Sequence, residues 1–481
     1  MAGFRVLQGK PCFHPVDAAD RYSSLHGPGA YLWNALFLKM RPDDLSAIFY
    51  SKLAGVVAYT LALVAVATSM MRLLGGLRGW IATGLVIGMA GFFDQFVYWN
   101  HPDPHLLGAS ALSLLLLPGK ANTRAHTILF GVLGGWVFNL KIHAVLAFLP
   151  VAMSMIAQRR VAHLAFSIAM GLLVAMLPFC FADRFSASNY IDRLRLAAGH
   201  AKLAEIWWLN CDWLRLPSWV LIGVVLARLW YWVRDRPQPA DKPMYDVRFD
   251  GWFFLGLGIA IPLVAMLASK AGAGPHHFIM LLPAMAYAAI SICPRDPHKH
   301  LVFALILIVA VRGVFEPCQR RQNAVRRNIE RFDARQRPAL ARLWQLYTQD
   351  VPPEASVQMG YGGSGSYVLT YLRPVLAGRG NTDRIGVAAA MDTKLSGISL
   401  TPQNYRLLSS GQIEYWILPN DTKPFELKSF YSPWFPEDPF LFDDRWRDLF
   451  RKHYRCVRQN ESFALYQFAP SSVVESNNVV E

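Results

Sequence analysis

Long, uncharged apolar runs fill most of the first two-thirds of the chain. A membrane hydrocarbon core of about 30 Å takes about 20 apolar residues per helix, and a helix pairs its own backbone polar groups inside it. The runs therefore predict about ten membrane-spanning helices. They cover residues 46–71, 79–98, 104–117, 126–139, 142–157, 161–182, 216–233, 251–269, 277–294 and 300–315. The third to fifth runs are short or polar for isolated spans, so we expect them to pack inside the bundle.

Polar residues dominate from about residue 316 to residue 481. Short runs rich in β-branched and aromatic residues predict strands here, and longer stretches with helical periodicity predict helices. The expected strands are 356–360, 385–391, 414–418 and 463–468, and the expected helices are an Arg-rich one at 319–347 and another at 367–376. The fold class is thus an all-α polytopic membrane bundle with a small C-terminal α/β extracytoplasmic domain. Its predicted parts are an outer-face loop with an interfacial helix (1–45), the bundle (46–315) and the soluble domain (316–481).

Composition supports a membrane protein. Only 17% of the 481 residues are charged, 53% are hydrophobic and the mean hydropathy is +0.24, which is too apolar for a soluble domain of this size. The net charge of +15 would suit a nucleic-acid partner. However, the sequence has no helix-turn-helix, zinc-finger or RNA-binding motif, and the basic residues stand between apolar runs, so no nucleic acid is expected.

The six cysteines lie far apart and include no CxxC pair, which argues against a zinc site. The sequence is compatible with a disulfide between Cys12 and Cys211 or between Cys318 and Cys456, and it does not decide whether either forms.

Basic residues are concentrated in one of the two alternating sets of short loops, and the positive-inside rule places that set in the cytoplasm. The set includes Arg72, Arg78, Lys120, Arg124, Arg159, Arg160, Arg234, Arg236, Lys242, Arg248, Arg295 and Lys299. The loops near 100–103, 139–143 and 270–277 are almost free of Lys and Arg, so we assign them to the outer face. Ten spans then also place the tail outside. The Arg-rich stretch 320–342 opposes this, but five loops agree against it.

Polar residues from four distant segments fall on that outer face. Charged and His residues near a membrane are costly, so they are candidates for function. They are His26 and Tyr31, His101 and Asp103, Lys141 beside His143, and His276 with His277. Simpler interpretations remain open. A His can serve only as a hydrogen-bonded structural residue, Lys141 can extend to the lipid headgroups, and Asp103 can cap a helix that begins at Pro104.

Residues 360–365 satisfy the pattern GxGxxG between a predicted strand and helix, and Asp392 follows near the end of the next predicted strand. A dinucleotide site would use such glycines to bring a pyrophosphate to a helix N-terminus. Pro374 interrupts the helix, and the outer compartment lacks nicotinamide cofactors. We therefore interpret the glycines as a tight turn.

Several of these segments, in this order and spacing, resemble the GT-C class of membrane glycosyltransferases over residues 5–315. The similar family contains protein O-mannosyltransferases, the lipid A aminoarabinose transferase and lipopolysaccharide-core galacturonosyltransferases. The segments are Gly9-Lys10-Pro11 with Phe13, His26-Gly27-Pro28 through Tyr31-Leu32, the basic turn near Arg78, His101-Pro102-Asp103-Pro104, and Lys141 after Gly134-Gly135.

The resemblance implies transfer of a sugar from a polyprenyl-phosphate carrier to a lipid, glycan or protein acceptor outside a bacterial inner membrane. It implies that Asp103, where the family has Arg-Pro-Asp or similar at 101–103, contacts the sugar, the acceptor or a divalent metal ion. It places His26, before the stretch containing Tyr31, near the donor phosphate. Lys141 and His276 or His277 would neutralise that phosphate. No other cofactor is implied.

The catalytic base is the unmatched part of the resemblance. The family has an acidic residue in a first outer loop, ahead of the segment that matches Arg5–Gly9, whereas this sequence begins at Met1. We therefore expect an upstream membrane helix that carries the missing loop. The alternative is that Asp17 or Asp20, the only early acids, acts as the base.

Ten membrane helices and a net positive charge also fit a transporter or flippase of a lipid-linked or anionic substrate. The sequence lacks two related halves with broken spans, which are typical of transporters. A non-catalytic assembly factor is the third alternative.

Overall fold

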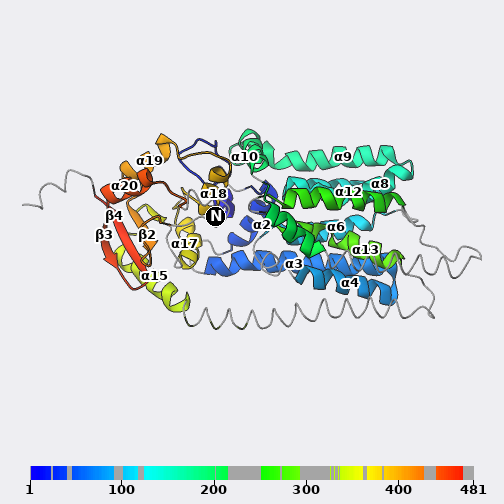
Figure 1. Ribbon diagram of the computed structural model, residues 1–481, viewed down its shortest axis with the longest axis horizontal. Coiled ribbons are helices and arrows are strands. Elements are labelled where there is room, and N and C mark those ends of the chain that lie inside the picture. Colours follow the sequence, from blue (N-terminus) through cyan, green and yellow to red (C-terminus); the bar gives the residue numbers. More distant parts are fainter. Residues whose placement is uncertain are drawn as a thin grey trace, which may run out of the picture.

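Long helices lie side by side at one end of the molecule and a small sheet with short helices lies at the other, in the computed structural model of the chain (Figure 1). The N-terminus and a short helix, α2 (Pro28–Leu38), lie between these two parts. The structure describes residues 2–22, 25–40, 46–91, 101–117, 124–200, 202–214, 251–270, 273–292, 326, 330, 334, 336–360, 366–381, 384–426 and 440–469.

The bundle holds one continuous apolar core. Its described elements are α3 (Ser46–Leu74), α4 (Gly76–Gly91), α6 (Asp103–Leu114), α7 (Arg124–Phe138), the 3-10 helix η1 (Ile142–Phe148), α8 (Leu149–Ala157), α9 (Val161–Met176), η2 (Leu177–Cys180), α12 (Gly251–Ala268), η3 (Pro275–Leu281) and α13 (Leu282–Ile292).

Three described helices are long and apolar enough to cross a membrane, namely Phe49–Leu74, Val161–Cys180 and Gly251–Ala268. The short helix α6 is buried along almost its whole length, as expected for the third apolar run. The total of about ten spans stays a prediction. Two of those spans, 216–233 and 300–315, lie outside the described residues.

Glycines allow α7 and α9 to approach closely. A Cβ atom on Gly131 would lie 2.5 Å from the Ser167 carbonyl oxygen, and one on Gly135 would lie 2.4 Å from that of Gly171. Small residues four apart bring helix backbones together in membranes in this way. Ser167 Oγ also donates a hydrogen bond of 2.8 Å to the carbonyl oxygen of Thr127. The two helices are therefore fixed against each other along their middle turns.

Consecutive bundle helices run in opposite directions, so their connections separate into two ends. One end, which we call the basic end, carries Arg72, Arg78, Arg124 and the Arg159–Arg160 turn. Arg78 donates to the Ile290 carbonyl oxygen there at 2.6 Å. The opposite end faces the C-terminal domain (Figure 1) and we call it the site end. This separation agrees with the two loop sets found in the sequence; which end faces the cytoplasm stays a prediction.

The C-terminal domain is a four-stranded sheet covered on both faces. Its order is β1 (Val357–Met359), β2 (Tyr415–Pro419), β4 (Phe463–Phe468), β3 (Tyr454–Gln459), with β1 parallel to β2 and the other pairs antiparallel. Side chains alternate between the faces of a strand. Tyr415 and Ile417 accordingly lie in one apolar core, and Trp416 and Leu418 lie in the other. The helices are α15 (Arg337–Asp350), α16 (Ser366–Leu369), α17 (Arg373–Gly378), α18 (Val387–Leu395), α19 (Pro402–Ser409) and α20 (Asp444–His453).

Three of the four expected strands are present, but the strand expected at 385–391 is wrong. Residues 387–395 form helix α18 instead of a strand, because the run of alanines at 388–390 favours a helix once Val387 starts it. The helix expected at 367–376 is two short helices, with Pro374 at the start of the second. Strand β3 was not expected, because its residues after Tyr454 are exposed and follow no apolar alternation.

Other sequence-based expectations fall partly outside the described residues. Residues 361–365 of the glycine pattern and most of 319–336 are among them. Gly360 packs against Leu418, whose side chain would lie 2.5 Å from a Cβ at that position. Cys12 and Cys211 do not form a disulfide, so the first of the two expected disulfides is absent. Cys456 is also free, and Cys318 is not described.

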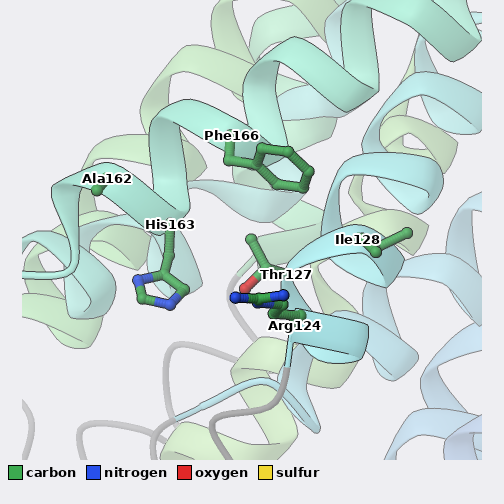
Figure 2. Close-up of a pocket in the computed structure, with 6 residues that line it drawn as sticks. All are labelled: Arg124, Thr127, Ile128, Ala162, His163 and Phe166. Atoms are coloured by element: carbon green, nitrogen blue, oxygen red, sulfur yellow. The ribbon is translucent and has the colours of Figure 1, made fainter.

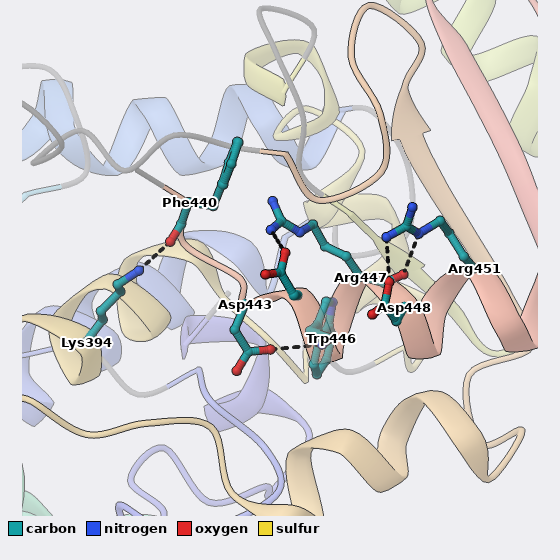
Figure 3. A network of polar contacts seen from close by, with 8 residues as sticks. Lys394, Phe440, Asp443, Trp446, Arg447, Asp448 and Arg451 are labelled. Carbon is teal, nitrogen blue, oxygen red and sulfur yellow. Dashed lines mark hydrogen bonds and ion pairs between the residues drawn. The ribbon is translucent and has the colours of Figure 1, made fainter. Parts of the chain in front are cut away.

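Helix α20 is held at its start by a network of polar contacts (Figure 3). Asp443 is its N-cap, and its Oδ1 accepts a hydrogen bond of 2.8 Å from the Trp446 backbone N–H. Its Oδ2 accepts one of 2.5 Å from the Tyr405 hydroxyl on α19. Lys394 on α18 donates to the carbonyl oxygen of Phe440. These contacts tie α18 and α19 to the start of α20.

Residues 8–22, which we call the N-terminal arm, join the bundle to the C-terminal domain. Arg21 is 1% exposed and enters that domain. Its Nε donates to Asn404 Oδ1 at 3.1 Å, its Nη1 to Thr393 Oγ1 at 2.9 Å, and its Nη2 to the Ser399 carbonyl oxygen at 2.7 Å. The arm backbone also pairs with Ile385 in a parallel bridge.

On its other side the arm packs against α10 (Ala187–Gly199). Arg193 on α10 is buried and lies 2.8 Å from His14 Nδ1. Burial and Arg193 lower the pKa of His14 to about 3, so its ring is neutral at physiological pH. Ser396 Oγ, just after α18, donates to the Leu196 carbonyl oxygen at 3.1 Å. The arm is thus enclosed by α10 and the C-terminal domain.

Asp392→Asn should stabilise the protein at pH 8 and change it little at pH 4. Burial raises the pKa of Asp392 on α18 to about 7, although Arg193 opposes the shift. A carboxyl with a raised pKa holds its proton more tightly in the folded state. Its contribution to stability is therefore complete below about pH 4 and is lost as the pH rises to about 7. Thermal melting of parent and variant across this range tests it; a melting difference that does not vary with pH would contradict it.

Candidate active site

A buried ion pair lies at the centre of the site end. Lys141 Nζ lies 2.8 Å from Asp103 Oδ1, and the side chains are 6% and 1% exposed. Asp103 is the first residue of α6, and Lys141 precedes η1. The other Asp103 oxygen lies against His101 Nδ1. Helix α6 begins at Asp103 itself, with Pro102 as its N-cap, so Asp103 is not the N-cap of a helix that begins at Pro104.

Five histidine rings lead away from this pair in a chain of contacts. His101 lies 4.9 Å from His26 and 6.0 Å from His276, measured between ring centroids. His277 follows at 4.4 Å from His276, and His143 at 4.8 Å from His277. His143 Nε2 and His277 Nδ1 are buried and have no hydrogen-bond partner in the described part of the chain. Buried polar atoms are normally paired, so these nitrogens are suited to contact a bound molecule.

Backbone contacts explain how His26 reaches this cluster. The turn after α7 receives two hydrogen bonds from the segment that follows His26: Gly27 N–H donates to Leu140 O at 3.0 Å, and Gly29 N–H donates to Asn139 O at 2.9 Å. A Cβ atom on Gly27 would lie 2.2 Å from Asn139 O, nearer than any side chain can pack. The sequence His26-Gly27-Pro28-Gly29 therefore sets His26 beside the turn that carries Lys141.

Gly27→Ala should move His26 away from the cluster and reduce the sugar transfer that the sequence resemblance implies by at least about tenfold. The added methyl group and the carbonyl oxygen of Asn139 cannot both keep their places. A misplacement of about 1 Å at a reacting centre is enough for losses of this size. The measurement is the initial rate of the reaction described below. Gly199→Ala is the control, because nothing lies within 4 Å of a Cβ there, and equal rates for both variants would contradict the prediction.

The structure brings together seven of the ten residues singled out from the sequence and separates the other three. The cluster contains Asp103, Lys141, His26, His101, His143, His276 and His277. Tyr31 lies in a separate aromatic group, 5.7 Å from Phe13.

The two early acids lie against the C-terminal domain. The carbonyl oxygen of Asp17 accepts from Thr401 at 3.5 Å, and the next two residues contact Asn404. Asp20 directly precedes Arg21, the residue of the arm that is buried among α18 and α19.

Asn139 is a further positioning residue that the sequence did not single out. Besides its carbonyl contact with Gly29, its Nδ2 donates to the Val174 carbonyl oxygen on α9 at 2.9 Å. The sequence indicates this positioning role only weakly: Asn139 lies two residues before Lys141, where an apolar run ends.

The donor set at Asp103 does not fit a divalent metal ion. The ammonium group of Lys141 occupies one carboxylate oxygen, and a second cation there would be repelled. Within the described ranges, no group of three or more His, Cys, Asp or Glu side chains is arranged to hold a metal. No step proposed below passes through a metal.

Two solved structures share this fold. The structure of ArnT from Cupriavidus metallidurans bound to undecaprenyl phosphate is 12% identical, with a TM-score of 0.54, over 97% of this chain and 95% of that one. The apo structure of the same protein is 11% identical, with a TM-score of 0.51, over 98% and 96%. No protein-family model and no curated protein sequence matches the chain. The predicted resemblance to GT-C membrane proteins is confirmed at the level of the fold.

Proposed function

We propose that this integral membrane protein is a glycosyltransferase that takes a sugar from a polyprenyl-phosphate carrier. It passes the sugar to a lipid, glycan or protein acceptor on the extracytoplasmic face of the membrane. The observation that carries the proposal is the buried Asp103–Lys141 pair among histidines at one end of an ArnT-like bundle. A related fold that holds undecaprenyl phosphate supports a lipid-phosphate donor.

Lys141 and the histidines are suited to bind the donor phosphate, and Asp103 is suited to activate the acceptor. A phosphate is an anion that a Lys ammonium binds as a point charge. The donor phosphate would draw Lys141 from Asp103, with His26, His276 and His277 around it. When the bond between the sugar carbon and the phosphate oxygen breaks, the new charge on the phosphate stays beside Lys141, and the leaving group needs no added proton.

The freed Asp103 carboxylate then has a role as the general base. It would take the proton of the acceptor hydroxyl as that oxygen attacks the sugar carbon. His101, against the other Asp103 oxygen, orients the carboxylate. Asp17 and Asp20 remain the alternative base, but their segment contacts the C-terminal domain, which favours Asp103.

Radiolabelled donor tests the proposal against the transporter alternative. The purified full-length chain in proteoliposomes is given polyprenyl-phosphate sugars and membrane acceptors. A glycosyltransferase yields a labelled glycoside and free polyprenyl phosphate. Movement of the label across the bilayer with no new glycoside would replace the proposal with a flippase.

The orientation of the site end is a separate prediction. Alkaline phosphatase is active only outside the cytoplasm, so a fusion at residue 122 should be inactive and one at residue 350 should be active. The basic residues at the end of the bundle opposite the site provide the physical reason. The reverse pattern of activity would place the site in the cytoplasm and remove the mechanism given above.

A further inference from the structure

A cavity lies at the basic end, far from the candidate active site. It has a volume of about 270 Å³ and lies between α7 and α9 (Figure 2). The residues that line it are Arg124, Thr127, Ile128, Ala162, His163 and Phe166. Fourteen residues of helix separate Arg124 from Phe138 at the other end of α7, a distance of about 20 Å. A molecule bound here does not reach the Asp103–Lys141 pair.

The helix contact described earlier explains the cavity. The glycines at 131 and 135 hold α7 against α9, and the Ser167 hydrogen bond to Thr127 is the last close tie toward the basic end. Ile128 and Phe166, the residues next to this hydrogen-bonded pair in the sequence, line the cavity together with Arg124 and His163 from the first turns of the two helices.

The walls of the cavity combine a cation with apolar surface that faces outward. Figure 2 shows Arg124 and His163 on either side of the opening, with Phe166 and Ile128 beyond them. Phe166 is 50% exposed and Ile128 is 40% exposed. The outer face of α9 continues with exposed Ile168, Leu172 and Leu173, so this side of the bundle suits lipid.

The charge around the cavity has one sign. The turn before α9 adds Arg159 and Arg160, and the sequence has no Asp or Glu between residues 104 and 182. An anion in the cavity therefore meets only positive or neutral groups from α7, α8 and α9. Basic pockets between membrane helices on the cytoplasmic side bind anionic headgroups for this reason.

We propose that this cavity binds an anionic phospholipid of the leaflet at the basic end. Arg124 pairs with the lipid phosphate, and His163 donates a ring N–H to the headgroup. An acyl chain lies over Ile128 and Phe166 and continues along the exposed face of α9. The proposal concerns the opposite face from the candidate active site and does not depend on the proposed transferase activity.

Native mass spectrometry of the purified full-length protein tests this site. The parent protein is titrated with phosphatidylglycerol and with phosphatidylcholine of the same acyl chains. Phosphatidylglycerol should bind at least about tenfold more tightly. Each basic group near a membrane surface contributes about 1 kcal/mol, which is about fivefold in affinity. Arg124→Gln should therefore remove about fivefold of the preference, and Arg124→Gln with His163→Gln should remove most of it.

Three controls make the outcome decisive. Arg72→Gln removes an exposed Arg at the same end, outside the cavity lining, and should leave the preference unchanged. Arg124→Lys keeps the charge and should retain most of the binding. Arg124 and His163 are exposed, so the variants should melt like the parent without lipid. Equal binding of the two lipids, an equal effect of Arg72→Gln, or full competition by inorganic phosphate would each overturn the proposal.

Discussion

Asp103→Asn should lower the rate of sugar transfer by at least about 10²-fold per molecule of folded protein. The amide keeps the shape of the carboxylate, but it neither accepts a proton from the acceptor hydroxyl nor balances the charge of Lys141. The initial rate with radiolabelled polyprenyl-phosphate sugar is the measurement. Asp192→Asn is the matched control, because that carboxylate is 40% exposed on α10 and pairs with Arg195 on the surface at 2.8 Å. Near-normal turnover of Asp103→Asn would remove Asp103 from the site.

The same substitution has a separate effect on stability. Removing one partner of a buried ion pair leaves the other charge uncompensated and costs about 3–5 kcal/mol. Asp103→Asn and Lys141→Met should each lower the melting temperature. The double variant should melt above either single variant because it leaves no unpaired charge. If activity stays lost while stability returns, the loss belongs to the chemistry and not to unfolding.

Arg21→Met should destabilise the contact between the N-terminal arm and the C-terminal domain by about 3 kcal/mol. The change removes three hydrogen bonds of a charged donor, and such bonds contribute about 1.5–3 kcal/mol each to stability. The apolar side chain of Met packs in place of the Arg stem and offsets part of that loss. Ser399 O and Thr393 Oγ1 lose the donors they meet in the folded protein. Thermal melting followed by tryptophan fluorescence gives the loss, and limited proteolysis shows whether the arm is released.

A surface arginine on the same domain provides the control for Arg21. Arg406 lies on α19, two residues from Asn404, and its side chain is exposed. Arg406→Met should change the melting temperature little, since surface substitutions usually stay within about 0.5 kcal/mol. A loss at Arg21 no larger than the loss at Arg406 would show that the buried hydrogen bonds do not hold the arm.

The convergence of Asp103, Lys141 and the histidines could be inferred from sequence because it follows from topology. Each residue stands where an apolar run ends, and alternating spans bring every second end to the same face. The pairing itself was not predicted. It depends on the exact start of α6 and on the turn at Asn139, which apolar patterning does not determine.

Features that apolar patterning does not determine are harder to predict. Asp17 and Asp20 are the only early acids in the sequence, and Arg21 and Asn404 hold their segment against the C-terminal domain. The short apolar stretch 385–391 predicts a strand, but residues 387–395 form helix α18, which their alanine content favours. The place of the early acids is decided by contacts between residues far apart in sequence, whereas the helix follows from local composition.

The position of Arg21 has a mechanical consequence for the histidine cluster. Only four residues lie between Arg21, which is fixed inside the C-terminal domain, and His26, which contacts His101. Even fully extended, that stretch of chain spans no more than about 18 Å. Any rotation of the domain away from the bundle must therefore either pull on His26 or first release Arg21. The position of the C-terminal domain and the position of His26 in the cluster are therefore coupled through the four residues between Arg21 and His26.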